Sequence, residues 1–170
     1  MHSHAICLAM GTNMGDRAEN LRRALVELGG CFEVIAVSPI YETEPAYHLD
    51  QSRFLNQCCL ARTGLSSQNT LAQLKHSESA LGRAPGARFG PRLIDLDLLF
   101  YDDLVLTSPG LTVPHPLLHE RAFVLVPLND IAPEIVHPAL GVSVRELYEC
   151  LSDGEKRKVW AVGGAPGTGV

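Results

Sequence analysis

The sequence predicts an α+β fold, a ferredoxin-like split βαβ sandwich with a mostly antiparallel sheet and helices packed on it. Two observations predict this fold. Strand-like and helix-like stretches follow one another in the order β-α-β, β-α-β, and a hairpin and a C-terminal helix come after them. The chain has 170 residues, of which 46% are hydrophobic and 19% are charged, as expected for one globular domain. We therefore expect a single domain over residues 1–162 and a flexible, glycine-rich tail over residues 163–170.

Composition and charge argue against several classes of protein. A net charge of −5 disfavours binding to the phosphate backbone of DNA or RNA, which requires a basic face. The apolar run at residues 5–10 is too short for a membrane-spanning helix or a signal sequence, and no basic region precedes it. We therefore expect a cytoplasmic protein that has no nucleic-acid or membrane partner and that is a monomer.

The N-terminal part of the chain is predicted to form a strand, a tight turn and a helix. Residues 4–10 have the composition of a buried strand, and residues 11–15 have that of a turn. Asp16 can cap a helix that runs to about Leu28, with Gly29-Gly30 as its stop. The turn matches neither a Rossmann fingerprint nor a P-loop, so a nucleotide would have to be held in another way.

Two further strands are predicted at residues 32–38 and 54–61. Between them, residues 41–47 are expected to form a loop. Its aromatic and hydroxyl groups could line a pocket for a planar ligand, or the loop could be a plain surface connection. Asn56 shares a strand face with apolar residues, so its amide must find partners. Either the local backbone or the polar edge of a ligand could supply them.

A second helix is predicted from Ser66 or Ser67 to Leu81, with Gly82 as its stop. Glu78 lies on the apolar stripe of this helix, three residues before Leu81. A glutamate at this position either extends to solvent at the margin of the stripe or points into a site.

The C-terminal third is predicted to add a hairpin and helical segments. Residues 104–107 and 111–113 are expected to pair as a hairpin that continues the sheet. A short helix or turn follows Arg121 and ends near Pro127, and Ser143 can cap the last helix.

The strand predicted at residues 94–100 carries the strongest chemical signal. Its even positions are all large and apolar: Ile94, Leu96, Leu98 and Phe100. Asp95 and Asp97 therefore fall on the opposite face, with Cα atoms about 6.5 Å apart. Two carboxylates this close repel each other unless a cation joins them. The pattern predicts a Mg²⁺ site, since Mg²⁺ takes one or two protein carboxylates and leaves its other positions to water and phosphates.

Three arginines precede this strand, in a segment that glycines and prolines prevent from being regular: Arg83, Arg88 and Arg92. A mobile basic loop beside an acidic metal site suits the polyphosphate of a nucleotide. The two aspartates could instead be the solvated outer face of an antiparallel strand. The arginines and the Gly-Pro-Arg directly before the strand favour the metal site. His115, fixed between two prolines, is interpreted as a donor facing phosphate and not as a zinc ligand.

Six short motifs occur in one order over roughly residues 4–138. They are Gly11-Thr12-Asn13, Tyr41-x-Thr43-x-Pro45, Phe54-Leu55-Asn56, Gly90-Pro91-Arg92-x-x-Asp95-Leu96-Asp97, Leu111-Thr112-Val113-Pro114-His115 and Arg121-x-Phe123-x-Leu125-x-Pro127-Leu128. Together they resemble the motifs of 6-hydroxymethyl-7,8-dihydropterin pyrophosphokinases, folate-pathway enzymes that move pyrophosphate from ATP to a pterin alcohol. The resemblance implies this reaction, with two Mg²⁺ ions, ATP and the pterin alcohol.

The resemblance also implies site residues. Asp95 and Asp97 would bind the metal ions, and they would form the catalytic set together with Arg83 and Arg92. The positions implied to contact ATP are Lys75, Glu78, Arg83, Arg88, Arg92, Leu98, Thr112, His115 and Arg121. Those implied to form the pterin pocket are Thr43, Pro45, Ala46, Phe54, Asn56, Asp95 and Phe123. Asn56 would bond the pterin ring and Phe123 would stack on it.

The chain also departs from the family pattern. Glu44 replaces a usual proline, Lys75 a frequent glutamine and Phe89 a tryptophan, and no second arginine directly follows Arg83. Two other functions stay open at this point. One is a polymerase-β-like nucleotidyltransferase, although its turn and carboxylates normally lie much closer together in sequence. The other is a non-catalytic ferredoxin-like ligand-binding module.

Overall fold

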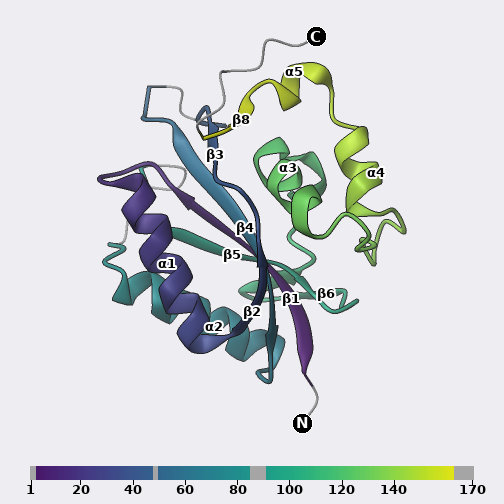
Figure 1. Ribbon diagram of the computed structural model, residues 1–170. Helices are drawn as coiled ribbons and strands as arrows, with labels where there is room; N and C mark the ends of the chain where they lie inside the picture. The colour runs from purple at the N-terminus through teal and green to yellow at the C-terminus, as the bar shows by residue number, and fades with distance from the viewer. Residues whose placement is uncertain (1–2, 48–49, 85–90, 163–170) are drawn as a thin grey trace.

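The structure, a computed structural model, describes residues 3–47, 50–84 and 91–162 of the chain. It contains a six-stranded sheet (Figure 1) made of β1 (His4–Thr12), β2 (Glu33–Val37), β3 (Tyr41–Thr43), β4 (Phe54–Thr63), β5 (Asp95–Tyr101) and β8 (Val159–Ala161). The strand order is β5-β1-β4-β3-β8, and β2 pairs with β4 on the same side as β3. Every pairing is antiparallel.

The helices lie on both faces of this sheet (Figure 1). They are α1 (Arg17–Cys31), α2 (Ser67–Ala80), α3 (Ala122–Ile131), α4 (Val144–Glu149) and α5 (Asp153–Lys156), with a 3₁₀ turn η1 at Leu118–Glu120. The first two cover one face, and α3 and α4 pack on part of the other. Two helices over antiparallel strands in the order β5-β1-β4-β2 confirm the predicted ferredoxin-like fold. Among the described helices, none is long and apolar enough to cross a membrane.

Each sheet face has its own core, because alternate strand residues point to opposite sides. Under α1 and α2 the core contains Ile6, Leu8, Leu21, Leu28, Leu74, Leu96 and Leu98. Under α3 and α4 it contains Cys7, Cys58, Leu99, Phe100, Leu125, Leu128 and Leu147. The second core leaves uncovered the part of β5 where Asp95 and Asp97 lie.

The predicted helix caps are present. The side chains of Asp16, Ser66 and Ser143 each accept a hydrogen bond from the backbone N–H three residues later. Gly82 follows α2 with φ +94°, a conformation that glycine adopts at no steric cost. The predicted stop of α1 at Gly29-Gly30 is wrong. The helix continues through both glycines to Cys31. Phe32 follows as the C-cap: its N–H donates to the Leu28 carbonyl, and its ring is buried in the core.

The prediction that Phe100 packs on the same face as Leu96 and Leu98 is wrong. The β1–β5 register shifts between Cys7 and Leu8, so that β5 contains an extra residue there. Beyond this bulge, Phe100 joins the core under α3 and α4.

The hairpin of β6 (Leu106–Ser108) and β7 (Leu111–Val113) forms a separate two-stranded sheet. The prediction that this hairpin continues the main sheet is therefore wrong. The outer edge of β5 has other hydrogen-bond partners. The Leu96 N–H donates to the Glu78 carboxylate, and the Leu99 carbonyl accepts from the His115 N–H.

The structure contains two strands, β3 and β8, that were not predicted, and its helix α3 is longer than the short helix or turn that was predicted. Residues 41–43 of the predicted loop form β3, which bridges β4 and β8. The segment containing β8 shows little alternation and was not predicted as a strand. The helix α3 continues through Pro127 to Ile131, although proline has no N–H to donate to the preceding turn. The Pro127 ring is buried.

Candidate active site

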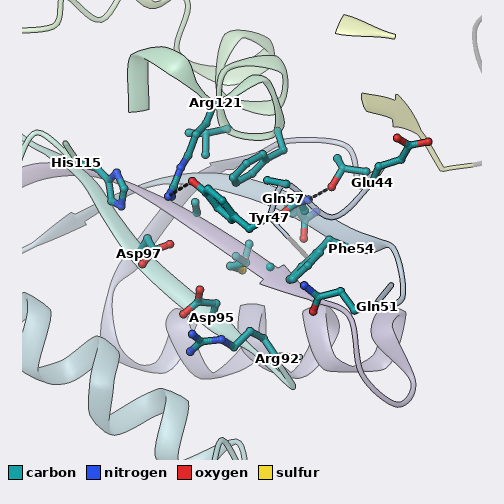
Figure 2. A pocket seen from close by; sticks show the side chains of 18 residues that line it. Glu44, Tyr47, Gln51, Phe54, Gln57, Arg92, Asp95, Asp97, His115 and Arg121 are labelled. Atoms are coloured by element: carbon teal, nitrogen blue, oxygen red, sulfur yellow. Dashed lines mark hydrogen bonds between the residues drawn. The ribbon is translucent and has the colours of Figure 1, made fainter. Parts of the chain in front are cut away.

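A pocket of about 220 Å³ opens on the sheet face that α1 and α2 leave uncovered. Figure 2 shows side chains from several distant segments pointing into it. They are Ala9, Met10, Gly11, Thr43, Glu44, Ala46, Tyr47, Gln51, Phe54, Asn56, Gln57, Arg92, Asp95, Asp97, His115, Arg121, Phe123 and Val124. We define the charged end of the pocket as Arg92, Asp95, Asp97 and His115. We define its aromatic end as Thr43, Phe54, Asn56 and Phe123.

The two aspartates of β5 lie next to each other at the charged end (Figure 2). Asp95 pairs with Gly11 and Asp97 with Ala9, so both carboxylates point to the face away from α1 and α2, as predicted. Burial, followed by repulsion from the Asp95 carboxylate, raises the pKa of Asp97 to about 6. Across the described residues, no cluster of three or more His, Cys, Asp or Glu side chains could hold a metal ion. A two-carboxylate site suits Mg²⁺ better than zinc.

An ion-pair group backs the charged end. The Glu78 side chain is only 4% exposed, and its Oε1 accepts the Leu96 N–H at 2.8 Å. Its Oε2 lies 2.5 Å from Arg83 Nη1, which also lies 2.8 Å from Asp95 Oδ1. Lys75 Nζ approaches Glu78 at 3.2 Å. Glu78 therefore neither extends to solvent nor lines the pocket. Its carboxylate binds the edge of β5 and the Arg83 guanidinium beside Asp95.

Arg92 reaches the pocket from the irregular residues before β5. Figure 2 shows its side chain beside Asp95. The structure does not describe residues 85–90, so Arg88, predicted to bind ATP, and the Phe89 departure lie outside the described residues.

His115 presents a neutral ring at the charged end. Burial, followed by the positive charge of Arg121, lowers its pKa to about 4. Its Nδ1 accepts the Leu117 N–H at 3.3 Å, which places the ring proton on Nε2. At neutral pH the remaining ring nitrogen, Nε2, is therefore a hydrogen-bond donor.

Arg121 connects two sides of the pocket. Its guanidinium lies over the rings of Tyr47 and Phe123, 5.8 and 5.5 Å from their centroids. It also donates to the Tyr47 hydroxyl at 2.9 Å, as Figure 2 shows. Its Nε is buried without a hydrogen-bond partner among the described residues. Arg121 thus connects the residue 43–47 segment to α3.

The amide of Asn56 is held at the aromatic end. Its Nδ2 donates to the Thr43 hydroxyl at 2.7 Å, which fixes the orientation of the amide. A Cβ atom at Gly11 would lie 3.0 Å from Asn56 Oδ1, so glycine leaves room for that oxygen. Phe54 and Phe123 also line this end, and they provide apolar ring surfaces beside the amide.

The remaining predicted site residues lie outside the pocket. Pro45 lines an adjoining cavity of about 280 Å³ together with part of the residue 43–47 segment. Leu98 is buried in the core under α1 and α2, and Thr112 lies in β7. Lys75, Glu78 and Arg83 form the group behind Asp95.

The pocket also contains residues that sequence reasoning did not select. Tyr47 and Gln51 line it, as do Glu44 and Gln57. Tyr47 belongs to the segment expected to line a pocket for a planar ligand, so its ring was an available signal. Gln51 follows no pattern in the sequence that distinguishes it from a surface residue.

Comparison with known families and proteins agrees with this arrangement. Residues 7–133 match the family model of 7,8-dihydro-6-hydroxymethylpterin-pyrophosphokinase (HPPK). The chain is 36% identical over 141 residues to the 2-amino-4-hydroxy-6-hydroxymethyldihydropteridine pyrophosphokinase of Aquifex aeolicus. That alignment covers 83% of this chain and 88% of the relative.

Other relatives are much longer. Over 146 residues the chain is 44% identical to the folic acid synthesis protein fol1 of Schizosaccharomyces pombe, covering 85% of this chain and 20% of that protein. It spans 23% of the Dictyostelium discoideum folic acid synthesis protein FOL1. The chain thus spans about a fifth to a quarter of the length of these relatives.

Solved structures show the same fold. An HPPK-DHPS crystal structure from Plasmodium falciparum matches with a TM-score of 0.70 at 17% identity. The match covers 87% of this chain and 45% of that one. Because the family model matches most of the sequence and the Aquifex aeolicus relative aligns over most of both chains, this chain belongs to the HPPK family.

Proposed function

We propose that this chain transfers pyrophosphate from ATP to the hydroxymethyl group of 6-hydroxymethyl-7,8-dihydropterin, releasing AMP, in folate synthesis. The observation that carries the proposal is the division of one pocket into a charged end and an aromatic end. A polyphosphate requires cations and donors, whereas a flat heterocycle requires ring surfaces and an amide. The names of the Aquifex aeolicus and Bacillus subtilis relatives support the same reaction.

Within this proposal, the aromatic end binds the pterin. Phe123 and Phe54 would contact the ring faces, and Asn56 would pair with the polar ring edge. Because Thr43 already fixes the amide, its orientation is set before the ligand arrives. A preorganised amide loses less entropy on binding than one that must be ordered.

The charged end would hold the triphosphate. Asp95 and Asp97 are oxygen donors on an open strand face, which fits a metal ion that keeps water and phosphate in its remaining positions. We propose that they bind two Mg²⁺ ions, which would neutralise phosphate charge when bound. Arg92 and the Nε2–H of His115 can donate to phosphate oxygens, and Arg83 lies behind Asp95.

The reaction needs positioning and charge neutralisation more than a covalent intermediate. The pterin hydroxyl oxygen attacks the β-phosphorus of ATP, the bond from that phosphorus to the α–β bridging oxygen breaks, and AMP leaves with that oxygen. The hydroxyl proton is lost to solvent. Arg92, at the charged end, would donate to the oxygens on which charge develops during transfer. We also propose that the protein acts as a monomer.

The test is a product assay. The protein is mixed with ATP, Mg²⁺ and the pterin alcohol, and the nucleotides are separated. AMP and the pterin diphosphate should form in equal amounts. Asp97→Asn should abolish most of this turnover, whereas Asp103→Asn, on the exposed turn after β5, should leave it unchanged. ADP as the product would refute pyrophosphate transfer, and pyrophosphate as the product would point instead to a nucleotidyltransferase.

A further inference from the structure

A buried amide outside the pocket connects two of the segments that line it. Asn13 follows β1 and is 4% exposed. Its backbone N–H donates to the Arg92 carbonyl at 2.9 Å, and its Oδ1 accepts the Arg92 N–H at 2.7 Å. Arg92 lies just before β5, where no strand pairing holds the chain. Asn13 therefore binds both backbone polar groups of Arg92.

The nitrogen of the same amide binds the neighbouring residue 51–52 segment. Asn13 Nδ2 donates to Gln51 Oε1 at 3.0 Å and to the Ser52 carbonyl at 3.1 Å. Gln51 lines the pocket, and Ser52 is the next residue. Both amide protons and the amide oxygen are thus in use, so the partners fix the amide in one orientation.

We infer that Asn13 is a positioning residue that holds Arg92 and the residue 51–52 segment beside each other at one side of the pocket. The inference rests on the proposed function, because it assumes that Arg92 meets phosphate and that Gln51 borders the pterin. Asn13 contacts both segments through one side chain, so its loss should move both. A shift of about 1 Å in a catalytic group can cost a hundredfold in rate.

Asn20 provides a matched control. Its Nδ2 donates to Thr12 Oγ1 and to the Met14 carbonyl, so it stabilises the same turn without contacting Arg92 or residues 51–52. Asn20→Ala should lower thermal stability as Asn13→Ala does, yet leave kcat and both KM values within about twofold of wild type.

Two substitutions at Asn13 separate its two contacts. Asn13→Ala removes the side-chain bonds to both segments and keeps the backbone bond to the Arg92 carbonyl. We expect kcat to fall about ten- to a hundredfold and the pterin KM to rise several-fold, with ATP binding nearly unchanged. Asn13→Asp retains an oxygen acceptor for the Arg92 N–H but loses the donor to Gln51 and Ser52. It should raise the pterin KM as much while losing less of kcat, and this variant carries the test if Asn13→Ala does not fold.

A fluorescence signal tests the same contact without turnover. Trp160 is the only tryptophan, and the Arg53 guanidinium lies 4.9 Å from its ring centroid. Because Arg53 follows Ser52, both Asn13 variants should change ligand-free Trp160 emission, and Asn20→Ala should not. If wild type releases no AMP, the proposed function fails, while this emission still reports whether Asn13 holds the segment. The inference would be overturned if both Asn13 variants kept the kinetics and the Trp160 emission of wild type. It would also be overturned if Asn20→Ala lost as much kcat and raised the pterin KM as much as Asn13→Ala.

Discussion

The charged end and the aromatic end of the pocket are held by different forces in the ligand-free protein. Behind the charged end, Arg83 lies between Glu78 and Asp95, and the pKa of Asp97 at that end is raised above that of an ordinary aspartate. The positive charge of Arg83 compensates the negative charges of Glu78 and Asp95, and a bound phosphate would compete for these ion pairs. At the aromatic end, one hydrogen bond between Thr43 and Asn56 sets the recognition geometry in advance.

This difference leads to different kinetic expectations for the two ends. Groups that meet charge formed during transfer should act mainly on kcat, because they bind the transition state better than the substrate. Groups that recognise the unreacting ring should act mainly on the pterin KM, because they bind substrate and transition state alike. Substitutions at each end can break or sharpen this contrast.

Arg92→Ala should give the largest effect. We expect kcat to fall about a hundredfold or more, with ATP affinity changed only slightly. Steady-state kinetics with either substrate varied would measure both values. Arg22→Ala is the control, since Arg22 pairs with Glu19 on the exposed face of α1. A raised ATP KM with an unchanged kcat would place Arg92 in ground-state binding and remove the contrast.

Thr43→Val should act on the other end. It removes the acceptor for Asn56 Nδ2 while keeping the side-chain shape, so the amide loses its fixed orientation. We expect the pterin KM to rise about tenfold, with kcat and the ATP KM within about twofold. Thr43→Ser keeps the hydroxyl and should restore the wild-type KM. A matching loss of kcat in Thr43→Val would show that the two ends are not separable.

Gly11→Ala should give a smaller effect of the same kind. The added Cβ would meet Asn56 Oδ1 at 3.0 Å and push the amide by a few tenths of an ångström. The pterin KM should rise about two- to fivefold. Gly30→Ala, where a Cβ meets no atom within 4 Å, should leave the kinetics unchanged. An unaltered KM in Gly11→Ala would mean that the amide position does not limit pterin binding.

The smallest effect concerns pH and the ligand-free protein. The pKa of Asp97 is about 6 in the folded protein and about 3.8 when unfolded, so the folded state binds the proton more tightly. Asp97 therefore costs wild type stability as pH rises from about 4 to 6. Asp97→Asn lacks this cost, so its Tm advantage over wild type should grow by a few degrees across that range. Thermal melts at fixed ionic strength would show it, and a constant difference from pH 4 to 7 would contradict it.

Local patterns in the sequence were sufficient to predict most of the fold. Apolar composition indicated β1 and β4, alternation indicated β5, and capping residues indicated the starts of α1, α2 and α4. The errors arise where tertiary partners decide. The bulge at Leu99 of β5 reverses the side of Phe100, and β8 forms because the edge of β3 is available. Neither partner is visible in the local sequence.

The sequence predicted which residues line the site better than it predicted the hydrogen bonds and ion pairs that hold them. Asp95, Asp97, Arg92, His115 and Asn56 all line one pocket, as their motifs indicated. The position of Glu78 on the apolar stripe of its helix could not show that its carboxylate binds the Leu96 N–H of β5 and Arg83. The same is true of Asn13, because its partners are 38 to 79 residues away in sequence.

The central claim, that Asp95 and Asp97 carry the metal and nucleotide, is tested most directly by thermal melts without turnover. Tm is measured for wild type, Asp97→Asn and the control Asp103→Asn with no ligand, with ATP, and with ATP plus Mg²⁺. Ligand that binds only the folded state raises Tm. We expect wild type and Asp103→Asn to rise further when Mg²⁺ is added to ATP, and Asp97→Asn to lose most of that rise. A mutant that rises as much as wild type, or a wild type that does not respond to Mg²⁺, would show that these carboxylates do not bind the metal.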